Sequence, residues 1–177
     1  MTEKNDTSRF NEKYIFRNIR QEEITQAAEI EKICFPPNEA CSYEHMEKRV
    51  EKASELFLVA EDRATGRIAG FLNGLATDRE HLTDDFFTDA EVHDPNGKNI
   101  MLLGLDVLPE YQRQGLAREL VRCYKEREKA NGREKLILTC LPDKVEMYQK
   151  FGFKDHGIGG SVWGGEAWHE MSVELWG

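Results

Sequence analysis

The chain has 177 residues, of which 40% are hydrophobic, and this is enough to bury one core. Its 24 Lys and Arg residues against 33 Asp and Glu residues give a formal net charge of -9. This charge argues against nucleic acid as a partner; it suits a cationic small substrate, although net acidity also serves solubility alone. No apolar run approaches the roughly 18 residues that a membrane span needs, so we expect a cytoplasmic protein with no membrane partner.

The four cysteines give no sign of a metal site or a redox motif. Cys34, Cys41, Cys123 and Cys140 form no CxxC pair and do not cluster with histidines. We therefore expect reduced thiols and no bound metal.

The first half of the chain predicts a polar tail followed by alternating strands and helices. Residues 1–12 are expected to be disordered, and residues 13–177 to form one domain. Aromatic and β-branched residues predict a strand over 14–19, and apolar residues at helical spacing predict a helix over 21–35. Further along, the pattern predicts a helix from Ser42 and a hairpin of strands over 55–62 and 66–76.

The second half begins with a long polar excursion, residues 77–99, at a strand edge. A nearly continuous apolar run over 100–108 is typical of a central strand buried on both faces. It is followed by a helix that runs to Gly132, a buried strand over 135–140, a short helix within 143–153 and a last strand within 166–176.

The stretch "QRQGLA", residues 112–117, combines features that favour phosphate binding. It lies between a buried strand and a helix, so free backbone N–H groups meet the positive end of the helix dipole. Gly115 allows close approach to the backbone, and Arg113 and Arg118 add charge. The alternative from this motif alone is a helix start whose small residues merely pack on a sheet.

Two other phosphate-binding motifs are absent from the sequence. It contains no GxxxxGK followed by Ser or Thr, and no GxGxxG follows a strand near the N-terminus. A P-loop and a dinucleotide-binding fold are therefore excluded.

Two longer stretches extend the pattern. "LDVLPEYQRQGLARELV" followed by "LTCLPDKVEMYQKFGF" resembles the acetyl-CoA-binding core of the GCN5-related N-acetyltransferase (GNAT) superfamily. "EIEKICF", "YQKFGF" and "WHEMSVEL" are similar to its arylalkylamine (serotonin) N-acetyltransferase branch. The resemblance implies an α/β GNAT fold with a mixed, mostly antiparallel sheet of six to seven strands flanked by about four helices. It also implies acetyl transfer from acetyl-CoA to the primary amine of a small molecule, by a monomer or homodimer.

The resemblance also implies roles for particular residues. Tyr148 matches the tyrosine beside the coenzyme sulfur, and we expect it to donate a proton to the leaving thiolate. The coenzyme would be bound by Leu105, Asp106, Val107, Gln112, Arg113, Gln114, Gly115, Leu116, Ala117 and Arg118. The amine would be bound by Phe35, Pro37, Glu39, Tyr43, Met46 and Trp168.

One departure concerns the general base. The arylalkylamine branch carries two histidines on the strand before the phosphate loop, and Met101 and Leu103 stand at those positions here. Glu39 and Asp106 are the nearest acids in sequence, but strand alternation puts Asp106 on the opposite face from Leu103. We therefore expect a water relay or capture of the neutral amine.

Two other functions share these motifs. A protein N-terminal acetyltransferase of the ribosomal-protein type would need an open groove for a peptide, whereas aromatic walls favour a small amine. A non-catalytic acyl-CoA sensor would keep the phosphate loop without turnover, and the retained Tyr148 argues against it.

Overall fold

The computed structural model describes residues 2–176, and the side chains of residues 7–176. Its helices are α1 (Thr2–Lys13), α2 (Ile24–Cys34), α3 (Tyr43–Ala53), α4 (Asp85–Thr88), α5 (Leu116–Ala130) and α6 (Val145–Lys150). Its strands are β1 (Tyr14–Asn18), β2 (Phe57–Asp62), β3 (Ile68–Thr77), β4 (Asn99–Val107), β5 (Lys135–Cys140), β6 (Lys154–Ile158) and β7 (His169–Glu174).

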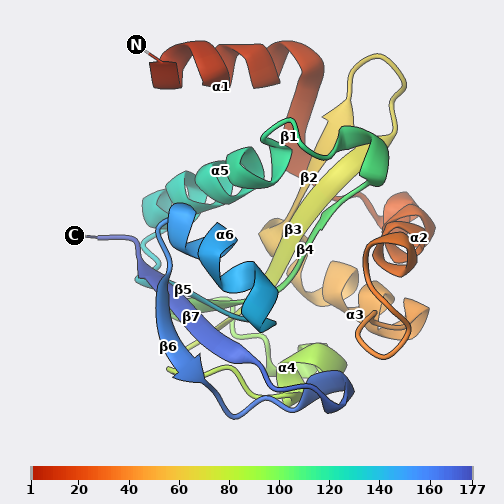
Figure 1. Cartoon of the computed structure of the whole chain (residues 1–177). Coiled ribbons are helices and arrows are strands. Elements are labelled where there is room, and N and C mark those ends of the chain that lie inside the picture. Colours follow the sequence, from red (N-terminus) through yellow and green to blue (C-terminus); the bar gives the residue numbers. More distant parts are fainter. Residues whose placement is uncertain (1, 177) are drawn as a thin grey trace.

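The seven strands form one sheet in the order β1-β2-β3-β4-β5-β7-β6. All neighbouring strands are antiparallel except β4 and β5, which run parallel. Helices α2 and α3 cover one face and α5 covers the other, as Figure 1 shows. The mixed, mostly antiparallel sheet expected for a GNAT fold is confirmed.

The core lies between the central strands and these helices. All ten residues of β3 are buried, because this strand is covered on both faces. Helix α5 buries Leu116, Leu120 and Tyr124 against the sheet. The Tyr124 hydroxyl donates to the Leu56 carbonyl at 2.9 Å, so its polar end is satisfied inside the core.

Helix α4 was not expected within residues 77–99, and segments near both ends of the chain also differ from the sequence expectation. Residues 2–12, expected to be disordered, form most of helix α1, which ends against the body of the protein through Phe10. This side chain is 8% exposed and stacks on Tyr14 at 6.4 Å between ring centroids. Strand β6 was not expected, because its residues are polar and alternate between exposed and half-buried at the edge of the sheet.

No helix in the described part of the chain is both long enough and apolar enough to cross a membrane.

Candidate active site

The site begins where β4 and β5 separate. These parallel strands pair only from Asn99 with Lys135 to Met101 with Ile137. In the β3–β4 pairing, Asn73 lies opposite Gly104 and Gly74 lies opposite Leu102, so Leu103 is an extra residue on β4. Such a bulge bends its strand, and here it falls where β4 leaves β5. The carboxyl halves of the two strands therefore enclose an opening in the sheet.

A turn with two left-handed residues connects β4 to α5. Arg113 has φ 61° and Gly115 has φ 84°, and the helix begins at Leu116. Successive N–H groups in such a turn form a concave surface for anions, and the first helical N–H groups have no partner within the helix. The turn therefore presents donors and the positive helix end to the opening, as "QRQGLA" predicts.

Side chains around the turn hold it in place. The Tyr111 hydroxyl donates to Asp62 Oδ2 at 2.7 Å, and Gln112 Nε2 donates to the Val107 carbonyl at 2.9 Å. Lys13 Nζ, at the end of α1, donates to Gln114 Oε1 at 2.9 Å. Helix α1 is thus tied to the turn before α5, a contact that the sequence did not indicate.

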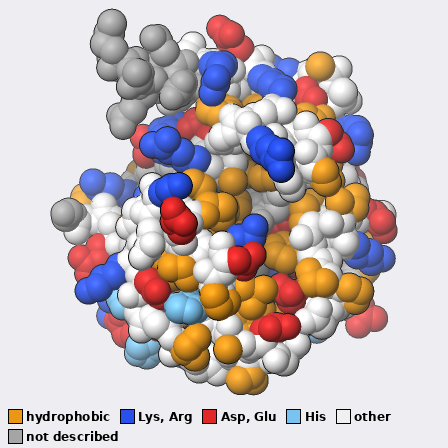
Figure 2. All heavy atoms as spheres, viewed as in Figure 1, with side chains coloured by type: hydrophobic (Ala, Val, Ile, Leu, Met, Phe, Trp, Pro, Cys, Tyr) orange, Lys and Arg blue, Asp and Glu red, His pale blue; other side chains and the backbone are white. Residues whose placement is uncertain are grey.

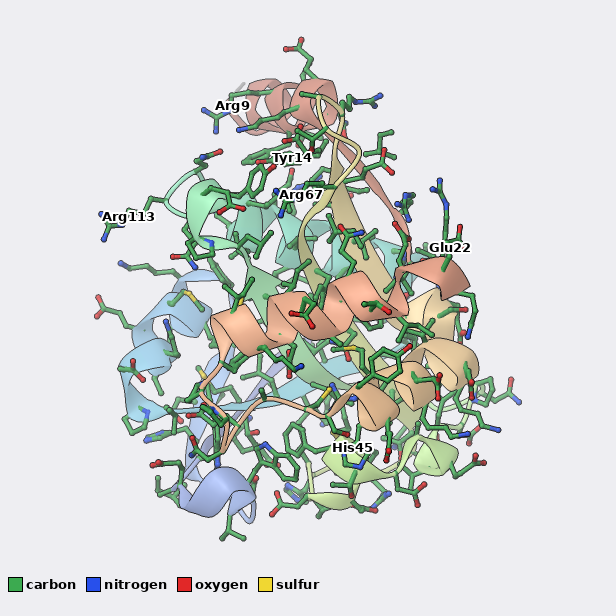
Figure 3. The ribbon with its side chains drawn as sticks, turned by 90° about the vertical axis from the view of Figure 1, so that its right-hand side faces the viewer. Arg9, Tyr14, Glu22, His45, Arg67 and Arg113 are labelled. Atoms are coloured by element: carbon green, nitrogen blue, oxygen red, sulfur yellow. The ribbon has the colours of Figure 1, made fainter. Side chains whose placement is uncertain are left out.

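A cavity of about 710 Å³ extends from this turn through the opening between β4 and β5. Figure 2 shows hydrophobic atoms in the walls of a hollow on this face and Lys and Arg side chains near its rim. Arg113 projects outward from the turn in Figure 3. Most of the residues expected to bind the coenzyme line the cavity: Leu105, Val107, Gln112, Arg113, Gly115, Leu116, Ala117 and Arg118. Asp106 and Gln114 are not among the lining residues.

Tyr148 lines the same cavity from helix α6. Its ring packs edge-on against Phe151 and Phe153, with centroids 6.0 and 5.7 Å away. Among the described residues its hydroxyl has no hydrogen-bond partner. Burial raises the pKa of this phenol, with further contributions from Cys140 and Asp106, so it stays protonated across the neutral range. Tyr148 therefore places a protonated phenol at the cavity wall.

Aromatic side chains enclose the other end of the cavity. Phe35, Glu39 and Trp168, all expected to bind the amine, line it, whereas Pro37, Tyr43 and Met46 do not. Pro36 lies at the wall in place of Pro37, Tyr43 is 43% exposed, and Met46 is fully buried in the core.

Phe87 and Trp163 also line this end and were missed from the sequence. Their rings stack at 5.1 Å, and Trp163 Nε1 donates to the Glu39 carbonyl at 2.9 Å. Trp168 Nε1 donates to the Trp163 carbonyl at 2.7 Å. The tryptophan in the glycine-rich stretch "SVWGG" was the available signal, because such a segment seldom carries a large ring without a packing role.

A polar group lies in the wall between the two ends. Glu31 and Arg49 line the cavity, and each is 3% exposed. Asn73 and Asp106 lie beside them on β3 and β4, at 2% and 0% exposure. The sequence contained a signal for Glu31, since it falls among the apolar positions of α2 at helical spacing from Ala27 and Cys34.

The cysteines and histidines supply no nucleophile or base at the cavity. Burial raises the thiol pKa of Cys34 and Cys41 to about 11 and that of Cys140 to about 12, so these lining thiols stay protonated near neutral pH. None of the histidines lines the cavity in the described structure. His45, for example, lies on α3, far from Arg113 in Figure 3. No group of three His, Cys, Asp or Glu residues suited to a metal ion occurs within residues 7–176.

Divergent parallel strands followed by an anion-binding turn and a long helix define an acyltransferase fold of the GNAT class. A family model described as "Acetyltransferase (GNAT) family" matches residues 24–153, most of the chain. The chain belongs to this family.

Individual related proteins match the chain at low sequence identity. The chain is 28% identical over 158 residues to "Probable hydrolase YhcX" of Bacillus subtilis (strain 168), a match that covers 85% of this chain and 30% of that protein. The chain thus spans less than a third of that relative's length.

Solved structures share the fold at low identity. The loading GNATL domain of CurA from Lyngbya majuscula matches with a TM-score of 0.80 at 18% identity, covering 92% of this chain and 98% of that chain. The GphF GNAT-like decarboxylase in complex with isobutyryl-CoA matches with a TM-score of 0.75 at 17% identity, covering 91% and 99%. Other matching GNAT structures contain CoA or acetyl-CoA.

Proposed function

We propose that the protein transfers an acetyl group from acetyl-CoA to the primary amine of a small molecule. One observation carries this proposal: a single cavity joins the anion-binding turn, the Tyr148 hydroxyl and an aromatic end that contains acidic side chains. The cavity therefore has places for the coenzyme, the reacting thioester and an amine in one continuous space.

The coenzyme side of the cavity fits a long anionic donor. The pyrophosphate would lie at the turn and the first N–H groups of α5, near Arg113 and Arg118. The pantetheine arm would follow the free backbone of β4 at Leu105 and Val107, where no strand pairs on the β5 side. GNAT structures that contain CoA or acetyl-CoA support this donor.

The chemistry fits direct attack by the amine on the thioester. Protonated cysteines do not supply an acyl-accepting thiolate, so a covalent acetyl-enzyme is not favoured. A backbone N–H near Leu105 would stabilise the oxyanion, and Tyr148 would give its proton to the leaving thiolate.

The acceptor side favours a compact cation with an apolar body, such as an arylalkylamine or a polyamine. Phe35, Phe87, Trp163 and Trp168 supply apolar walls. Burial and the neighbouring charges of Glu166 and Asp143 raise the pKa of Glu39, so this acidic cluster would be stabilised by a bound cation. An extended peptide, the substrate of the alternative N-terminal acetyltransferase, would need an open groove in place of these walls.

A thiol-release assay with acetyl-CoA tests the proposal. The panel should contain 2-phenylethylamine, tryptamine, putrescine, spermidine and short peptides with free N-termini, with an amine-free control for thioester hydrolysis. We expect turnover with at least one small amine, and mass spectrometry should find the acetylated product. Turnover of peptides only would establish the alternative substrate class, and coenzyme binding without any turnover would indicate a sensor.

A further inference from the structure

Two buried carboxyl groups meet in the cavity wall, on helix α2 and strand β4. Glu31 is 3% exposed and Asp106 is fully buried, and the structure brings their side chains together. Among the described residues, Glu31 Oε1 and both carboxyl oxygens of Asp106 have no hydrogen-bond donor. The other oxygen of Glu31 accepts the Cys41 N–H at 3.0 Å, so this side chain is held in place.

The pair borders the cavity at Gly104, a lining residue. A Cβ at this position would lie 3.1 Å from Asp106 Oδ1, 3.2 Å from Asn73 Nδ2 and 3.5 Å from Glu31 Oε1. Because Gly104 has no side chain, only its backbone separates these buried polar atoms from the cavity. Glu31 and Tyr148 both line this cavity, and the Asp106 charge contributes to the raised pKa of Tyr148.

In the described part of the chain, the neighbouring side chains give the free carboxyl oxygens of the pair neither a hydrogen bond nor an ion pair. Arg49, on α3, donates to Asn73 Oδ1 at 3.5 Å and to the Phe87 carbonyl at 3.1 Å. Within the described structure it forms no ion pair with either carboxylate. The other titratable groups facing the pair are Cys34, Cys41 and Tyr148, whose pKa values are all raised.

Two carboxylates at close range without donors cannot both stay ionised at low cost. Burial and the charge of Glu31 raise the pKa of Asp106 well above its ordinary value. Asp106 therefore holds its proton more tightly than an exposed carboxyl does, and a pair of carboxyl groups that shares a proton can act as a general base.

We infer that Glu31 binds the ammonium group of the acceptor and receives its proton, and that Asp106 acts through Glu31 as a positioning residue. This inference rests on the proposed function. It replaces the water relay or capture of neutral amine expected from Met101 and Leu103, because Glu31 lines the cavity and carries a carboxylate that can take the proton.

Groups already described can donate and accept every proton that the reaction moves. One N–H bond of the ammonium breaks, its proton moves to a carboxylate oxygen of the pair, and the nitrogen lone pair attacks the thioester carbonyl carbon. When the C–S bond breaks, the thiolate takes the proton of Tyr148, and the phenolate regains a proton from the newly attached nitrogen. The pair then returns its proton to solvent, and no oxidant or other reactant is needed.

The test compares the pH dependence of kcat/KM for 2-phenylethylamine in wild type, Glu31→Gln and Asp106→Asn. At neutral pH we expect Glu31→Gln to lose about 10²–10⁴-fold in kcat/KM, the contribution of a positioned base. The loss should shrink about tenfold per pH unit toward the amine pKa, because the neutral amine needs no base. Asp106→Asn should change the ascending limb of the profile, because the group beside Glu31 then no longer exchanges a proton.

A matched control lies on the same helix. Glu29 is 63% exposed and pairs with Lys32, so Glu29→Gln removes the same charge from α2 without touching the cavity, and we expect no change in kcat/KM. Acetyl-CoA affinity by calorimetry should be unchanged in Glu31→Gln, and its melting temperature should not fall, since glutamine can still accept the Cys41 N–H. Calorimetry with 2-phenylethylamine in the presence of CoA should show about tenfold weaker amine binding in this variant.

The outcomes separate this inference from the proposed function. A wild-type protein that binds acetyl-CoA but acetylates no amine contradicts the proposed function, and the inference falls with it. If the wild-type protein acetylates 2-phenylethylamine and the folded Glu31→Gln variant has the same pH profile and the same amine affinity, the inference about Glu31 is wrong while the proposed function stands.

Discussion

Tyr148 lines the cavity, and its hydroxyl has no hydrogen-bond partner among the described residues. This single hydroxyl group gives the first prediction. Tyr148→Phe keeps the ring contacts to Phe151 and Phe153 and removes only the proton donor. We expect kcat to fall about 10²–10⁴-fold while acetyl-CoA affinity stays within about twofold. Steady-state kinetics and calorimetry check this, and near-normal kcat in the variant would leave Tyr148 a packing role only.

Asp106 gives a second prediction, on stability against pH. Its pKa is raised in the folded state, so the folded protein keeps a proton that the unfolded chain has already lost. Its contribution to stability is therefore fully present below the ordinary carboxyl pKa of about 4 and is lost as pH rises toward the raised value. This group adds a slope of up to about 1.4 kcal/mol per pH unit to the free energy of unfolding.

Denaturant unfolding of wild type and Asp106→Asn over a pH series measures this slope as a difference. The advantage of Asp106→Asn should grow as pH rises. A constant difference between the two proteins across the series would show that Asp106 titrates like an ordinary carboxyl.

Among the elements, the turn before α5 allows a matched pair of substitutions. Gly115 and Gly132, at the two ends of the helix, both have φ 84°, so Ala strains the backbone equally at each, by about 1–2 kcal/mol. Only Gly115 lies at the proposed phosphate site. A Cβ there would also lie 3.4 Å from the Phe10 ring, whereas Gly132 has open space.

We expect Gly115→Ala to weaken acetyl-CoA binding at least tenfold, because the added Cβ restricts approach to the backbone N–H groups. Gly132→Ala should lose similar stability and keep its coenzyme affinity. Equal affinities by calorimetry in both folded variants would exclude the turn as the phosphate site.

Most elements could be predicted because their signals are local. Apolar spacing predicts α2 and α5, a buried apolar run predicts β4, and Ser42 caps α3 by accepting the His45 N–H at 3.1 Å. Helix α1 and strand β6 were missed because their polar sequences acquire structure from tertiary neighbours. The bulge at Leu103 could not be predicted either, because it depends on the pairing register between β3 and β4.

The same distinction between local and long-range signals applies to the residues of the candidate site. The phosphate turn and Tyr148 could be proposed because each belongs to a contiguous motif. The contact between Glu31 and Asp106 joins residues far apart in sequence, and Phe87 and Trp163 meet from opposite halves of the chain. Such pairs carry no local pattern, so only the folded arrangement brings them together.

At the scale of the whole molecule, the net charge of -9 makes a prediction about association. A field of this sign attracts cationic amines, and salt screens it over a Debye length of about 10 Å at 0.1 M. With acetyl-CoA saturating, raising NaCl from about 50 to about 500 mM should lower kcat/KM several-fold for putrescine and less for 2-phenylethylamine. Equal salt dependence for both amines would show that the field does not steer the acceptor.

The position of β7 between β5 and β6 affects how the protein forms during translation. Strand β6 leaves the ribosome before β7, yet among the described strands it pairs with β7 alone. Until residues 169–174 emerge, β5 presents an unpaired edge and β6 has no strand to pair with. Nascent chains arrested before residue 169 should therefore be open to protease and chaperone binding in their C-terminal third, while the hairpin of β2 and β3, complete much earlier, is already protected.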